Sequence, residues 1–153
     1  MNPTLIHQKR LRAACLQHRG PYQKIAETFA RLEPIAEAAG LFDSPPQLIA
    51  IYYDNPATVP ASGLRSDAGL LIAEGTAVPD GLTEVILAAG SYVHARHVGP
   101  YDTLSTTWAR LKEFVSDGNG PRRGNGPGYE IYRNNPMTAP PKDLLTDVFI
   151  PTA

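Results

Sequence analysis

The chain has 153 residues, of which 42% are hydrophobic and 19% are charged, and its formal net charge is −1. This length supports one compact core rather than two ordinary domains, and the near-neutral charge excludes the basic surface on which direct nucleic-acid binding depends. No apolar run is long enough to cross a membrane, the N-terminus does not resemble a signal peptide, and the single cysteine, Cys15, cannot form an internal disulfide, so we expect a cytoplasmic protein without membrane association.

The chain contains two copies of one sequence pattern. The motif His-Arg-Gly-Pro-Tyr at 18–22 recurs as His-Val-Gly-Pro-Tyr at 97–101, 79 positions later. The segment 51–56 recurs at 131–136, displaced by one residue more. Two copies of one supersecondary unit predict a single pseudo-twofold domain over the whole chain.

Each copy predicts the order strand, helix, strand, strand. In chain order we expect a strand at 10–18, a helix at 21–39, strands at 47–54, 67–73 and 82–89, then a strand at 91–98, a helix at 100–116 and strands at 128–134 and 144–150. The first repeat then covers about 10–73 and the second about 82–151. The fold class is α+β, with antiparallel strands and the helices packed on them.

Two connecting segments have distinctive compositions. The strand at 82–89 is followed by Ala-Gly-Ser and another strand, which predicts a hairpin with residues 92–97. The segment 118–128 is so rich in glycine and proline that we expect an irregular loop.

The repeats differ most informatively at Glu130, whose counterpart is Ala50. Strand alternation places Glu130 and Tyr132 on one face, and Tyr129 and Ile131 on the other. A carboxylate in an apolar strand is costly when it is buried without a partner. Either Glu130 lies on a solvated face, or it is buried and contacts a ligand. The half-buried character of the strand around Ala50 favours the second interpretation.

If the ligand is an organic cation, a carboxylate and aromatic rings attract it together. The aromatic residues expected to line the site are Tyr132, Tyr101, Trp108, Tyr52 and Tyr22. Trp108 also has a structural interpretation, because it holds a helical core position that Phe29 holds in the first repeat. The tyrosines of the two Gly-Pro-Tyr motifs are equally compatible with packing against the helix starts.

Other repeated polar residues are interpreted as architectural. His18 and His97 end equivalent strands and are expected to be hydrogen-bonded, and Asp67 and Asp147 begin equivalent strands. Cys15 is expected in the core. The histidines do not have metal-ligand spacing, so we expect neither a metal nor a cofactor.

Taken together, these motifs resemble the C-terminal half of GyrI-like (DNA gyrase inhibitor) proteins, in the segments 96–104, 108–111, 129–136 and 144–151. The resemblance implies two strand-helix-strand-strand modules, the SHS2 fold, with a ligand cleft between the repeats. It also implies that the glutamate at position 130 lies in that cleft and recognises cationic or amphipathic aromatic compounds.

The same domain forms the effector-binding part of AraC-type and MerR-type regulators. Because this chain begins at the first repeat, we expect a stand-alone sensor, scavenger or toxin-resistance protein. The favoured function is non-enzymatic binding of a cationic or aromatic small molecule, as in multidrug binding.

Two alternatives stay open. The resemblance implies that some members are hydrolases of cyclopropane-containing genotoxins, with Glu130 and either Tyr132 or Tyr101 as catalytic residues. The third function is inhibition or modulation of DNA gyrase by protein contact, for which the segment 118–128 is the expected contact.

Overall fold

The structure, a computed structural model, describes residues 2–116 and 118–153. The chain divides into two compact units. We call Arg10–Ala88 the first-repeat unit, and Met1–Lys9 together with Ala89–Ala153 the second-repeat unit. The single domain over the whole chain stays a prediction.

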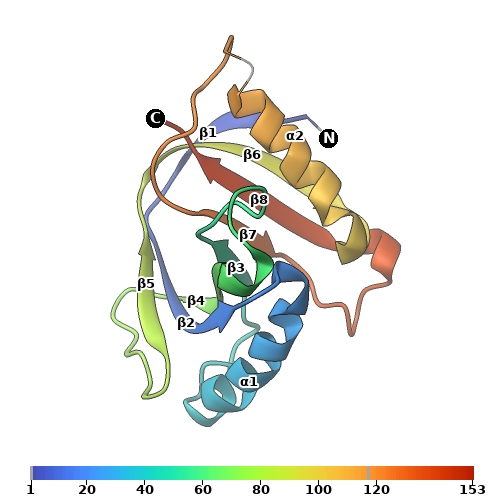
Figure 1. The fold of residues 1–153 in the computed structure, drawn as a ribbon. Helices are drawn as coiled ribbons and strands as arrows, with labels where there is room; N and C mark the ends of the chain where they lie inside the picture. The colour runs from blue at the N-terminus through green and yellow to red at the C-terminus, as the bar shows by residue number, and fades with distance from the viewer. Residues whose placement is uncertain (1, 117) are drawn as a thin grey trace. The chain divides into compact units, whose positions relative to one another are not determined.

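The first-repeat unit is an antiparallel sheet with one face covered by a helix (Figure 1). Its elements are β2 (Leu11–Arg19), α1 (Ile25–Ala38), β3 (Leu48–Tyr52), β4 (Arg65–Ile72) and β5 (Thr83–Leu87). The strand order is β3-β4-β2-β5. Leu32 and Ala36 of α1 are fully buried against Ala14 of β2 and Leu70 of β4, and this apolar contact forms the core of the unit.

The second-repeat unit repeats this arrangement. Its elements are β1 (Thr4–Gln8), β6 (Gly90–Val98), α2 (Leu104–Ser116), β7 (Gly128–Tyr132) and β8 (Leu145–Pro151). The strand order is β1-β6-β8-β7, and α2 lies along β6 and β8 (Figure 1). Leu111 and Val115 of α2 are buried against Val93 and Val148. The α+β class and the order strand, helix, strand, strand in each repeat are confirmed.

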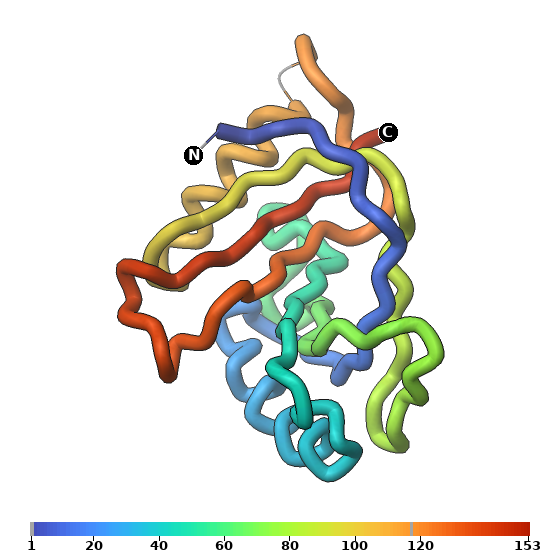
Figure 2. Tube along the Cα trace, turned by 180° about the vertical axis from the view of Figure 1, so that it is seen from behind, coloured from blue at the N-terminus to red at the C-terminus, as the bar shows by residue number. Residues whose placement is uncertain are grey.

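The predicted hairpin between residues 82–89 and 92–97 is wrong. β5 pairs with β2, in a register that places Thr83 opposite Cys15. Beside β6 lies β1, a strand that the sequence did not predict, with Thr4 opposite His94 (Figure 2). Only Ala88 and Ala89 separate β5 from β6, and alanine does not favour the positive φ angles of a two-residue hairpin turn.

The two repeats therefore exchange their first strands. β1 precedes the first repeat but belongs to the second-repeat unit, and β5 precedes the second repeat but belongs to the first-repeat unit. The pairs Thr4–His94 and Cys15–Thr83 are equivalent under the 79-residue repeat, so the exchange is reciprocal and keeps one register.

The repeated histidines join the end of a strand to the start of the following helix. His18 Nδ1 lies 2.7 Å from Thr28 Oγ1, and His18 Nε2 lies 2.9 Å from the carbonyl oxygen of Pro21. His97 Nδ1 lies 2.8 Å from Thr107 Oγ1 in the same way. Both histidines are buried, and the prediction that they are hydrogen-bonded is confirmed.

β2 and β4 approach each other closely at Gly69. A Cβ on Gly69 would lie 2.5 Å from Cys15 Sγ and 2.8 Å from the carbonyl oxygen of Ala14. We expect Gly69→Ala to lower the free energy of unfolding by about 1–3 kcal/mol, because the buried thiol and the backbone must move apart. Urea denaturation measures this loss. Gly63→Ala is the matched control, since its Cβ would meet Val59 at an ordinary 3.6 Å; equal stability of the two variants would contradict the packing argument.

No helix within the described residues has the length and apolar character needed to cross a membrane.

Candidate functional site

The candidate site is built on the helix-covered face of β7. Glu130 pairs with Val148 of β8, which belongs to the core beneath α2. The Glu130 side chain is 3% exposed, so the alternative of a solvated face is wrong. Its counterpart Ala50 is also buried and pairs with Ala68. Replacement of a methyl group by a carboxylate at one buried position is the main chemical difference between the repeats here.

Tyr101 and Tyr132 lie at one end of this face. Their ring centroids are 5.3 Å apart with the planes tilted by 60°, an arrangement typical of favourable aromatic pairs. Burial and then the negative charge of Glu130 raise the pKa of Tyr101. The phenol and the carboxylate are therefore close enough to interact electrostatically.

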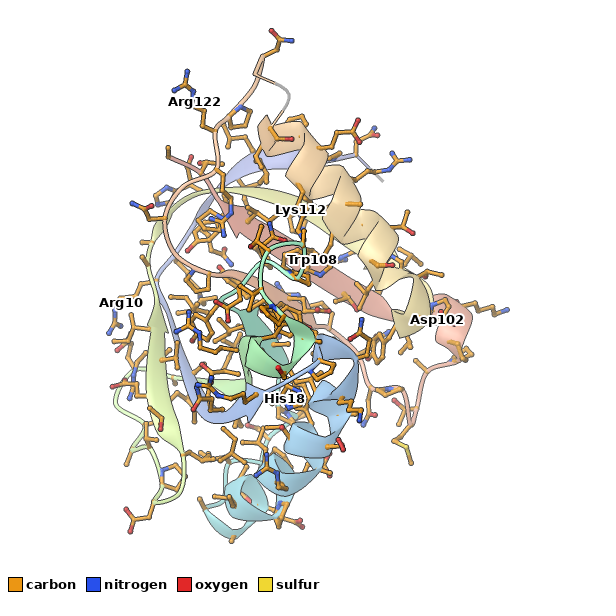
Figure 3. The ribbon with its side chains drawn as sticks, viewed as in Figure 1. Arg10, His18, Asp102, Trp108, Lys112 and Arg122 are labelled. Carbon is orange, nitrogen blue, oxygen red and sulfur yellow. The ribbon has the colours of Figure 1, made fainter. Side chains whose placement is uncertain are left out.

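Trp108 lies at the other end. It projects from α2 (Figure 3), is partly buried and packs against the core of the second-repeat unit. A Cβ on Gly128 would lie 3.0 Å from Cζ3 and 3.1 Å from Cη2 of its indole, so the ring rests on the backbone of Gly128. The structure thus brings four of the six predicted site residues together in one unit: Glu130, Tyr132, Tyr101 and Trp108.

The other two predicted residues, Tyr22 and Tyr52, lie in the first-repeat unit as an equivalent pair, with ring centroids 4.7 Å apart. The Tyr22 hydroxyl donates to the carbonyl oxygen of Asp54 at 2.8 Å and accepts from the Asp54 N–H at 3.0 Å. The Tyr101 hydroxyl makes no comparable bond within residues 2–116 and 118–153. Tyr22 is therefore held by the backbone, whereas Tyr101 lacks this bond among the described residues.

A polar cluster on the opposite face was not predicted from the sequence. Asp147 accepts hydrogen bonds from Arg96 Nε at 2.9 Å and Arg96 Nη2 at 3.0 Å, and from Arg133 Nε at 2.6 Å. His94 Nε2 lies 3.0 Å from the same carboxylate. Burial alone would raise the pKa of Asp147, but these three partners outweigh it and hold the pKa well below its usual range.

The equivalent carboxylate, Asp67, has no such partners. It accepts one hydrogen bond, from the Tyr53 hydroxyl at 2.5 Å. None of the described residues forms an ion pair with it. Cys15 and Gln17 stand at the positions of His94 and Arg96. Burial raises the pKa of Asp67, and the bond from Tyr53 offsets only part of that effect.

An open pocket of about 340 Å³ lies elsewhere in the second-repeat unit. Its lining residues are Arg96, His97, Val98, Thr103, Thr106 and Thr107. It contains none of the predicted ligand residues, and its histidine is already bound to Thr107 and to the Pro100 carbonyl. We do not assign the ligand site to it.

The model of the GyrI-like small molecule binding domain matches residues 1–153. The chain belongs to the GyrI-like family. Among GyrI-like relatives, a DNA gyrase inhibitor of Salmonella typhimurium is 33% identical over 96 residues, which are 61% of this chain and 62% of that protein. The chain thus matches about three fifths of the length of this curated relative.

Solved structures of low sequence identity share the fold of this chain. SAV2435 bound to tetraphenylphosphonium has a TM-score of 0.72 at 13% identity, over 100% of this chain and 94% of that chain. A hydrolase from Listeria innocua has a TM-score of 0.71 at 16% identity, over 99% of this chain and 91% of that chain. At these identities the likeness concerns the fold alone.

Proposed function

We propose that the protein binds cationic aromatic compounds at Glu130, with Tyr101, Tyr132 and Trp108 as its aromatic contacts. The observation that carries the proposal is the burial of Glu130, at 3% exposure, on the strand face that also carries Tyr132, whose ring pairs with Tyr101. The equivalent buried position of the first repeat is Ala50. A carboxylate in a poorly hydrated site attracts an organic cation more strongly than it would in water. Aromatic faces add a cation–π contribution.

A protein of the same fold supports an organic cation as the ligand. SAV2435, which shares the fold, is a protein bound to tetraphenylphosphonium. In this chain the Tyr101 hydroxyl is free of backbone bonds within the described residues, and it lies close enough to the Glu130 charge for its pKa to respond. A guest that displaces water from this face would contact both groups.

The proposal predicts a binding signal in the unmodified protein. Trp108 is the single tryptophan of the chain, so its fluorescence reports on this site alone. Tetraphenylphosphonium is expected to change that emission saturably and to raise the melting temperature. A ligand at 100 times its dissociation constant stabilises by about 2.7 kcal/mol. Neutral triphenylphosphine oxide is the control and is expected to bind more weakly. If millimolar tetraphenylphosphonium changes neither the emission nor the melting temperature, the proposal is contradicted.

Hydrolysis by the same residues is a second candidate, favoured by the effect of the Glu130 charge on the pKa of Tyr101, which places a phenol near a buried carboxylate. A carboxylate can activate water while a phenol polarises the substrate. Product formation from a cyclopropane-containing substrate, abolished in Tyr101→Phe, separates this candidate from binding alone. A contact with DNA gyrase, the third alternative, stays a prediction.

A further inference from the structure

The two repeats exchange large and small residues at one packing position. In the second repeat, Trp108 of α2 faces Gly128 at the start of β7. In the first repeat, the equivalent residues are Phe29 of α1 and Leu48 at the start of β3. A larger aromatic ring thus accompanies a smaller strand residue, as expected when the summed volume of a packed layer is conserved.

Glycine is needed at position 128 because there is no room for a side chain, and not because of the backbone conformation. Gly128 is not among the glycines with positive φ, so its backbone is accessible to any residue. A Cβ there would meet Cζ3 of Trp108 at 3.0 Å, Cη2 at 3.1 Å and the Phe149 carbonyl oxygen at 3.2 Å. The backbone conformation at position 128 does not require glycine. The absence of a side chain there instead lets the indole of Trp108 lie directly on the strand.

This placement puts the Trp108 indole on the same face of β7 as the Glu130 carboxylate. Gly128, Glu130 and Tyr132 alternate onto one face of β7. Residues two apart in a strand are separated by about 6.6 Å. This separation matches the width of one flat molecule of two or three fused rings. A leucine at position 128, as in the first repeat, would fill the space that the indole occupies.

We propose that Gly128 is the positioning residue of the ligand site, and that it makes the site selective for planar aromatic cations over aliphatic cations of the same charge. This inference rests on the proposed function, because it concerns the same site. Glu130 supplies attraction for either class of cation, whereas the indole seated on Gly128 supplies a contact that only a planar ring system satisfies.

Calorimetric titration of the full chain with two cations tests the inference: N-methylacridinium, which is planar, and tetrabutylammonium, which is aliphatic. The unmodified protein is expected to prefer the planar cation by about tenfold. Gly128→Ala displaces the indole, so its affinity for N-methylacridinium is expected to fall threefold to tenfold. Its affinity for tetrabutylammonium should change by less than about twofold. The Trp108 emission maximum of the free protein should also shift, which reports the displacement directly.

A double variant keeps the test usable if Gly128→Ala folds poorly. Trp108→Phe combined with Gly128→Leu copies the packing of Phe29 and Leu48, which the first repeat already tolerates. This variant should bind both cations with similar affinity. Gly63→Ala, whose Cβ meets Val59 at an ordinary 3.6 Å, is the control and should leave both affinities unchanged.

The possible results distinguish failure of the positioning role of Gly128 from failure of the proposed cation-binding function. If the unmodified protein binds neither cation, the proposed function fails and the inference fails with it. If it binds both, but Gly128→Ala weakens them equally or not at all, the positioning role alone is overturned. Loss of selectivity in both Gly128 variants, with tetrabutylammonium binding retained, supports the inference.

Discussion

Asp147→Asn is expected to lower the free energy of unfolding at pH 7 by about 3 kcal/mol, because it removes a buried carboxylate that is paired with two partly exposed guanidinium groups. Asp147 is 2% exposed and receives hydrogen bonds from Arg96 and Arg133, with His94 beside it. Asparagine has nearly the same shape but no charge, so the loss is electrostatic. Urea denaturation of the variant and the unmodified protein gives the difference.

The first repeat provides a matched control in Asp67→Asn. Asp67 is 8% exposed, accepts a bond from Tyr53 alone, and has its pKa raised by burial. Removing its charge is therefore expected to leave stability at pH 7 unchanged or to raise it by about 1 kcal/mol. Two chemically identical substitutions at equivalent positions thus have different expected effects: a loss of stability for Asp147 and no loss for Asp67.

The pH dependence follows from the direction of each pKa shift. The pKa of Asp147 is lower in the folded protein than in the unfolded chain, so its contribution is complete above about pH 4 and is lost as the pH falls below that value. The pKa of Asp67 is raised, so its ionisation costs stability as the pH rises above about 4. Both differences should shrink toward pH 2. A similar loss in both variants, independent of pH, would contradict the electrostatic explanation.

The burial of Glu130 could be predicted from the sequence because the two repeats can be compared with each other. Aligning the copies shows a charged residue where the other copy has alanine, and strand alternation assigns its face. Gly128 differs from its counterpart Leu48 in the same alignment, but its meaning depends on a second change, Trp108 for Phe29, and only the structure shows that these two positions touch.

The Asp147 cluster could not be predicted in this way. His94 and Arg96 come from β6 and Arg133 follows β7, far apart in the chain, and only the strand register brings them to one carboxylate. The exchange of β1 and β5 was missed for a related reason. Local alternation identifies a strand but not its partner, and β1 is short and half polar.

Glu130→Gln removes the buried charge and preserves the shape of the side chain, so cation binding by this variant shows whether the carboxylate recognises the ligand. A charge-assisted contact contributes about 1.5–3 kcal/mol, so calorimetry should show a 10- to 100-fold loss of affinity for tetraphenylphosphonium. Affinity for neutral triphenylphosphine oxide should change by less than about threefold.

Glu113→Gln, at an exposed position of α2, changes the net charge of the protein equally and is expected to leave both affinities intact. We expect a loss of affinity for the cation alone, and in the Glu130 variant alone. Equal losses for the cation and the neutral compound, or unchanged cation binding in a folded Glu130→Gln protein, would contradict it.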